Sequence, residues 1–225
     1  MIEFNIVWLI SLIVIISFSI IYVLNGIISY KKENKQSYSF LSNFPNELSF
    51  PNSIYRKRYL LFTLIYASLF SFVLWDTFPF ISTFGSFKIL VIFEAIFAII
   101  NGISFVLINL IEPKFIRQHT LISTIYLASC FGILAMISIF GILLFTTTGR
   151  ILPLIIGIIT TLLSILQILI ILNPKLKDWA KLEAFVDENK NINYRRPKIF
   201  ILALSEWLTF LLSTIGLILF LIVII

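Results

Sequence analysis

Three acidic residues stand inside long apolar stretches of the chain, where a carboxylate is costly. They are Asp76, Glu94 and Glu206. A charged side chain at the centre of a bilayer costs roughly 2.5–3.5 kcal/mol on insertion scales. An acid at that depth is therefore a candidate for binding a proton, an ion or a solute. Polar packing between helices is the competing interpretation for each of them.

Glu94 belongs to a stripe of polar and small residues at helical spacing. Asn101 follows two turns later on the same helix face, and the small residues between them permit close approach of a neighbouring helix. This face is expected to point into a bundle. There Glu94 would be protonated or paired with Lys88 or Arg150. Together with Asp76, these residues predict a neutral cluster at an outward-facing mouth.

Glu206 is the deepest of the three acids. It lies about 12 Å along a helix axis from Lys198 and is too short to reach water from that depth. Thr209, Ser213 and Gly216 follow on the same helix face. We expect this stripe to face protein or a wet cavity, and Glu206 and Thr209 are candidates for ligand or ion binding.

One cysteine and one histidine limit the chemistry open to the chain. Cys130 cannot form an intramolecular disulfide and is expected to be an inert core thiol, while His119 is expected in a solvated loop beside Arg117. No nucleophile elbow, zinc-protease, CxxC or Walker signature occurs. The sequence thus favours a non-enzymatic function over a membrane enzyme that uses Glu94 or Glu206 as acid or base. No metal or cofactor is expected.

Composition predicts the elements that hold these residues. The 225-residue chain is 60% apolar and 12% charged, with a mean hydropathy of +1.05, whereas soluble domains carry about 25% charged residues. This excludes a soluble globular protein, a disordered chain and a secreted disulfide scaffold. We predict an all-α, polytopic integral membrane protein in which one domain, 1–225, packs six transmembrane helices into one bundle. The spans are about 4–30, 59–80, 87–111, 121–145, 151–172 and 199–225.

Basic residues gather in three segments between these spans. Segments 31–58, 112–120 and 173–198 hold 15 of the 17 lysines and arginines, and Lys88 and Arg150 lie on the other side. The positive-inside rule then places the three segments in the cytoplasm and both termini on the outer side. The expected location is the plasma (inner) membrane of a prokaryote. The net charge of +6 is a topology signal, and no nucleic-acid partner is expected.

The segment 31–58 contains a repeated Phe-Pro-Asn motif. Proline keeps the preceding residue out of the helical region, so Phe44 and Phe50 are expected on extended or turn backbone. The two rings would dip into the lipid headgroups or form a docking surface for a partner.

The segment 173–198 begins with Asn-Pro, a helix start signal. Apolar residues, Trp179 among them, recur at spacings of three and four over 174–186. This pattern predicts a short interfacial amphipathic helix on the inner membrane face, which either anchors the chain or contacts a partner subunit through Trp179.

Two functional classes fit these features. The preferred one is a small transporter, or the membrane-embedded substrate-binding subunit of a transport complex, whose interior acids bind a proton, an ion or a solute. The alternative is a non-catalytic accessory or assembly subunit, whose loops hold partners while its polar stripes pack helices. In both classes the expected partners are the lipid bilayer and other membrane or peripheral subunits.

Overall fold

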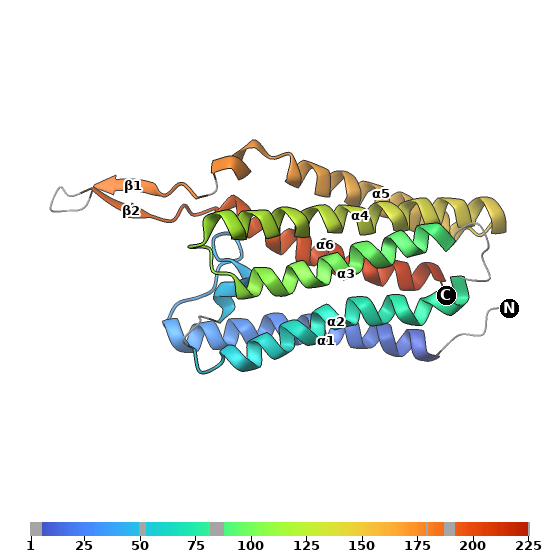
Figure 1. Ribbon diagram of the computed structural model, residues 1–225, viewed down its shortest axis with the longest axis horizontal. Coiled ribbons are helices and arrows are strands. Elements are labelled where there is room, and N and C mark those ends of the chain that lie inside the picture. The colour runs from blue at the N-terminus through green and yellow to red at the C-terminus, as the bar shows by residue number, and fades with distance from the viewer. Residues whose placement is uncertain (1–5, 50–52, 82–87, 179, 187–191, 225) are drawn as a thin grey trace.

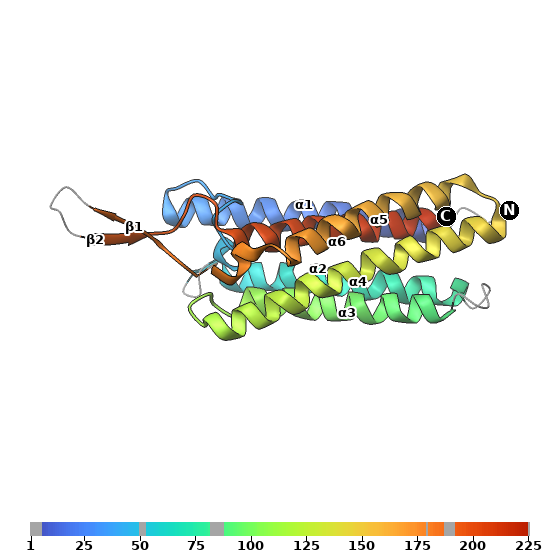
Figure 2. The same cartoon turned by 90° about the horizontal axis from the view of Figure 1, so that it is seen from above.

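The computed structural model describes residues 6–49, 53–81, 88–178, 180–186 and 192–224. Within these ranges the chain forms six α-helices that lie side by side in one bundle (Figures 1 and 2). Their bounds are α1 Ile6–Asn34, α2 Arg56–Ile81, α3 Lys88–Leu110, α4 Ile116–Thr148, α5 Ile151–Ile171 and α6 Ile201–Ile224. The predicted all-α membrane bundle is confirmed.

Five of these helices are long and apolar enough to cross a membrane: α1, α3, α4, α5 and α6, counted over the described residues. The remaining helix, α2, has 26 residues and packs against α1 and α3. Large aliphatic side chains cover the outside of the bundle, for example Ile13 and Ile20 on α1 and Leu162 and Leu169 on α5. Such an apolar exterior suits contact with lipid chains rather than water.

Helix α4 contacts three others, α3, α5 and α6. Its contact with α5 depends on two glycines that let the backbones approach. A Cβ atom added at Gly141 would lie 2.6 Å from the carbonyl oxygen of Pro153, and one added at Gly157 would lie 3.1 Å from that of Ser138. Ser138 Oγ also donates a hydrogen bond to the Gly157 carbonyl. Small residues thus set the spacing of this helix pair.

The start of α1 and the end of α6 lie at the same end of the bundle (Figure 1). The opposite end carries the short 3-10 helices η1 (Pro45–Leu48) and η3 (Pro174–Asp178) and a two-stranded antiparallel hairpin of β1 (Glu183–Val186) and β2 (Ile192–Arg195). The hairpin projects beyond the helices (Figures 1 and 2). We call this the hairpin end. The described parts of the three basic segments, 31–58, 112–120 and 173–198, lie there (Figure 1).

The prediction of one amphipathic helix over 174–186 was wrong. Its beginning forms η3 and its end forms β1, which pairs with β2 so that Glu183 stands opposite Arg195 and Val186 opposite Ile192. Cross-strand pairing with β2, further along the chain, stabilises this backbone. The spacing of apolar residues within 174–186 gives no information about that pairing. Trp179 lies outside the described residues.

Candidate functional site

A buried acid–base pair joins α4 to α6. His119 Nε2 lies 3.0 Å from Glu206 Oε1, and both side chains are fully buried. Ser123, one turn after His119 on α4, donates a hydrogen bond of 2.6 Å to the same carboxylate oxygen. Glu206 Oε2 is also buried and has no hydrogen-bond partner among the described residues. Two helices that are far apart in sequence therefore meet at a titratable centre.

The Ile111 carbonyl fixes which nitrogen of the imidazole carries a hydrogen. His119 Nδ1 lies 3.0 Å from the carbonyl oxygen of Ile111, which can only accept a hydrogen bond, so Nδ1 carries a hydrogen. Nε2 then either donates to an ionised Glu206 or accepts from a protonated one. The distance of 3.0 Å between Nε2 and Oε1 fits either arrangement.

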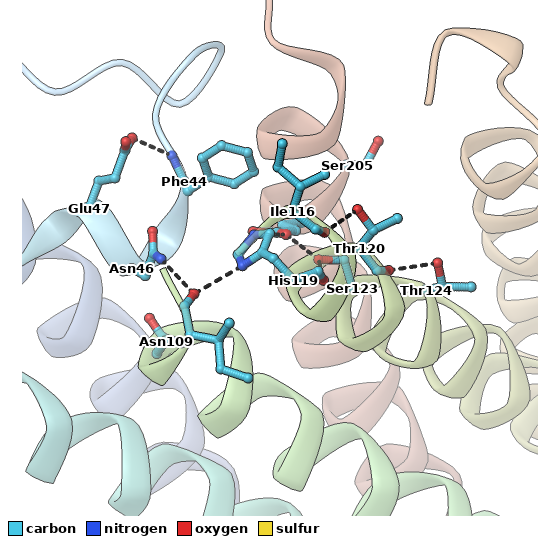
Figure 3. A network of polar contacts seen from close by, with 12 residues as sticks. Phe44, Asn46, Glu47, Asn109, Ile116, His119, Thr120, Ser123, Thr124 and Ser205 are labelled. Carbon is cyan, nitrogen blue, oxygen red and sulfur yellow. Dashed lines mark hydrogen bonds and ion pairs between the residues drawn. The ribbon is translucent and has the colours of Figure 1, made fainter. Parts of the chain in front are cut away.

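The Ile111 carbonyl connects this pair to the loop after α1. Asn46 Nδ2 donates to it at 3.1 Å, and dashed lines from Asn46 and His119 meet at this oxygen in Figure 3. Phe44 packs its ring edge-on against the imidazole, with 5.1 Å between the ring centroids, and also against Phe200. The pair is thus covered at the hairpin end by the segment that contains η1.

Tyr38 holds this covering segment on α6. Its hydroxyl donates to the carbonyl of Phe44 at 2.8 Å and accepts from Trp207 Nε1 at 2.9 Å. Burial raises the pKa of Tyr38, which keeps the phenol protonated and available as a donor. The backbone of Phe200 adds a bond of 2.7 Å to the Leu41 carbonyl. The cover is therefore fixed by hydrogen bonds as well as by ring packing.

A charged cavity of about 210 Å³ opens beside Asn46 at the hairpin end. Its lining combines three bases, two acids and one amide: Arg56, Lys114, Arg196, Glu47, Glu112 and Asn46. Four of the charges form two ion pairs, Arg196 with Glu47 and Lys114 with Glu112, both at 2.8 Å. We call this the hairpin-end cavity.

Arg56 is the third base of the cavity and is half-buried. Its two terminal nitrogens donate to the carbonyls of Ser49 at 2.7 Å and Asn109 at 2.6 Å. Among the described residues no carboxylate lies within ion-pair distance of it. The hairpin-end cavity therefore has an excess of one positive charge.

A second polar cluster supports the cavity from inside the bundle. Tyr59 Oη lies 2.7 Å from Asn109 Oδ1 and 2.6 Å from the carbonyl of Pro45, and Tyr22 Oη lies 2.5 Å from Tyr59 Oη. Tyr22 also stacks on Tyr59, with 5.4 Å between the ring centroids. These contacts tie η1, which carries the lining residues Asn46 and Glu47, to α1, α2 and α3.

The structure does not assemble the predicted outward cluster within the described residues. Glu94 is buried in α3, but its Oε1 has no hydrogen-bond partner there, and no ion pair joins it to Lys88 or Arg150. Arg150 is exposed at the turn between α4 and α5. Asp76 lies in α2, and its side chain is outside the described part. Asn101 donates to Ser129 Oγ at 3.1 Å, a contact between α3 and α4.

The remaining residues singled out from the sequence do not gather at one site. Thr209 is fully buried one turn after Glu206 and accepts a hydrogen bond of 3.0 Å from Gln167 Nε2, which links α5 to α6. Phe44, proposed for headgroups or partner docking, is instead fully buried against the protein. Phe50 lies outside the described residues. Cys130 is a buried free thiol, in the core as expected.

His119 is the residue that the sequence interpretation misplaced. It was expected in a solvated loop, whereas α4 begins at Ile116 and buries it completely. A usable signal existed: His119, Ser123, Tyr126 and Cys130 follow each other at spacings of four, three and four, which is the pattern of one helix face. Nothing in the local sequence pointed to Asn46 or Arg56.

Comparisons with protein-family models, curated proteins and solved structures find no match to this chain. No group of three or more potential metal ligands occurs in the part of the chain that the structure describes. The chemistry available is therefore that of a proton-holding pair next to a charged cavity, within a helical bundle of the membrane type.

Proposed function

We propose that the protein is a transporter, or the membrane-embedded substrate-binding subunit of a transport complex, in which the His119–Glu206 pair couples solute binding to a proton. The observation that carries this proposal is a fully buried acid–base pair that is connected, through hydrogen bonds to the Ile111 carbonyl, to the wall of a charged cavity. Ionisable groups inside membrane helices typically mark proton or ion pathways.

The connection supplies a route for the coupling. Glu112 and Lys114 line the cavity and follow Ile111 directly in the chain. A solute that binds to either side chain shifts the backbone next to Ile111. The Ile111 carbonyl, which accepts the hydrogen bond from His119 Nδ1, moves with it. The affinity of the pair for its proton then changes. By linkage, protonation changes the affinity of the cavity for the solute by the same factor.

Topology gives the direction of this arrangement. The basic segments lie at the hairpin end, so the positive-inside rule places the cavity on the cytoplasmic side and both termini on the outer side of a prokaryotic inner membrane. In this orientation the cavity is the inward-facing entrance to the bundle.

The experiment records currents from proteoliposomes on a solid support while small carboxylates, amino acids and sugars are exchanged over them with and without a pH gradient. A wild-type current that depends on the gradient is expected. Glu206→Gln keeps the volume and the hydrogen bond from Ser123 but cannot take up or release a proton at neutral pH, so its gradient-dependent current should be lost. Glu183→Gln, in the exposed hairpin, is the matched control. An unchanged current in Glu206→Gln would refute the proposal.

A second candidate function is that of an accessory subunit, favoured by the hairpin that projects beyond the bundle (Figure 1). Its exposed residues Glu183 and Arg195 lie 3.5 Å apart across the two strands. Replacement of 183–195 by a Gly-Ser linker, followed by purification in mild detergent, tests this function. A stoichiometric chain that co-purifies with wild type but not with the linker variant would support it.

A further inference from the structure

We propose that the hairpin-end cavity binds a small monocarboxylic acid that also carries a hydrogen-bond donor, such as an α-amino or α-hydroxy acid. This inference rests on the proposed transport function and names its substrate class. Three features of the cavity lead to it: its charge, an unpaired acceptor in its wall, and its size.

The charge of the cavity matches a single carboxylate. The two charges cancel within each of the pairs Arg196–Glu47 and Lys114–Glu112. This leaves the positive charge of Arg56 for a ligand. Two backbone carbonyls hold the Arg56 guanidinium in place, and a guanidinium has five N–H donors, so donors remain for a further acceptor. A planar guanidinium fits a carboxylate geometrically. A doubly charged phosphate would exceed the one available charge.

Asn46 supplies the second feature. The residue lines the cavity and is more than nine-tenths buried, and its Oδ1, which is itself buried, has no hydrogen-bond partner among the described residues. Because Nδ2 must donate to the Ile111 carbonyl, the amide orientation is fixed and Oδ1 is the atom left to accept. A buried acceptor without a partner is unfavourable, so a ligand that donates an N–H or O–H to it gains affinity.

The size of the cavity limits the ligand. At about 210 Å³ it lies below the range of about 300–1,000 Å³ that is typical of pockets for drug-sized ligands. The part of a ligand that this cavity holds is therefore small, and an acid with few heavy atoms fits within it.

Isothermal titration of the purified full chain in detergent at neutral pH tests the inference with four probes: glycine, glycolate, acetate and inorganic phosphate. Glycine or glycolate should bind at least tenfold more tightly than acetate, which lacks the donor; tenfold corresponds to about 1.4 kcal/mol. Phosphate should bind more weakly than the preferred acid. Absent binding of both glycine and glycolate, equal binding of acetate, or tighter binding of phosphate would each overturn the inference.

Variants locate the site. Arg56→Gln should lower the affinity for the preferred acid at least tenfold, and Asn46→Ala should remove its advantage over acetate. Arg58→Gln, two residues later on α2 and outside the cavity lining, is the matched control and should bind as wild type does. Unchanged affinity in Arg56→Gln would overturn the assignment of the site.

Arg56 also holds two loop carbonyls, so a variant without that structural role is needed. The Lys114 side chain is mostly exposed, and its contacts are an ion pair with Glu112 and a position over the ring of the neighbouring Phe115. Lys114→Glu should preserve the fold, checked by circular dichroism, and lower the affinity because it reverses one charge of the lining. A folded Lys114→Glu protein with wild-type affinity would equally overturn the proposal.

The two proposals can fail separately. Glu206 does not line the cavity, so Glu206→Gln should still bind the acid in detergent even though its gradient-dependent current is lost. A proton-coupled current for a solute outside this class, without binding of glycine or glycolate, would refute the substrate class alone. Binding of the acid without any gradient-dependent current would refute the transport function alone.

Discussion

A double-mutant cycle on His119 and Glu206 tests whether the two residues act as one unit. The variants are His119→Leu, Glu206→Leu and the combination of both. Leucine is close in volume to either residue, so the cycle removes polar atoms and leaves packing nearly unchanged. Ser123 has one hydroxyl hydrogen, which can go to Glu206 Oε1 at 2.6 Å or to the backbone carbonyl of residue 119 at 2.9 Å, so it still has an acceptor when Glu206 is replaced.

The magnitudes follow from what each variant leaves behind. Glu206→Leu strands Nε2 of a fully buried imidazole, and His119→Leu strands Oε1 of a fully buried carboxyl group beside Ser123. An imidazole and a carboxyl group each have a neutral form, so the cost is that of an unpaired buried polar group, about 1–3 kcal/mol. We expect about 2–3 kcal/mol for each single variant. The double variant strands neither group and should cost much less than the sum of the two single variants, because replacing both partners by apolar groups can be nearly neutral; the coupling should be at least about 2 kcal/mol.

The free energy of unfolding is measured by titration with SDS in mixed micelles, followed by tryptophan fluorescence. The control cycle combines His119→Leu with Ser138→Ala, about 28 Å further along α4, where additive effects are expected. If the double variant at positions 119 and 206 loses the sum of the two single losses within about 0.5 kcal/mol, the two side chains are not coupled and the interpretation of the pair is refuted.

Three further predictions use the same measurement or hydrogen exchange. Glu94→Leu should leave stability unchanged or raise it by up to about 1–3 kcal/mol, because its unpaired oxygen loses no partner among the described residues; a loss as large as that of Glu206→Leu would contradict this. Gly141→Ala should lower the free energy of unfolding by about 1–3 kcal/mol, since the added Cβ would clash with the Pro153 carbonyl. An unchanged free energy of unfolding would show that α4 and α5 can move apart without cost. Tyr38→Phe removes the donor to the Phe44 carbonyl and should speed amide exchange over residues 38–44, while exchange in α5 stays as in wild type.

The helices could be predicted from the sequence because each depends on local properties: a long apolar run at 1.5 Å per residue has one outcome in a bilayer. The start of α4 could not, because Arg117, Gln118, His119 and Thr120 have the composition of a loop. His119 becomes tolerable in a helix core only through Glu206 on α6 and the Ile111 carbonyl. These partners are tertiary contacts that no local pattern contains.

At the candidate site, too, some features could be predicted from the sequence and others could not. The depth of Glu206 within an apolar stretch indicated that it faces protein or a wet cavity, and the structure buries it. Its partner His119 was not predicted, since His119 was expected in a solvated loop and only Asp76 and Glu94 were grouped with Lys88 and Arg150 by depth. The amide of Asn46 and the guanidinium of Arg56 lie in or beside loops, where side-chain positions follow from backbone conformation rather than from periodicity.

The contact between α4 and α6 also constrains how the protein is made. Ser123 and Glu206 are separated by 83 residues, so at about 5–20 residues per second the ribosome delivers Glu206 about 4–17 s after Ser123. During that interval α4 exposes His119 and Ser123 with no carboxylate to receive them, and the loop that carries Phe44 has no α6 to bind. Insertion of α6 closes all of these contacts in one event. A nascent chain arrested before Glu206 therefore carries an exposed polar face in the membrane, a feature by which cellular quality control can distinguish unfinished chains from finished ones.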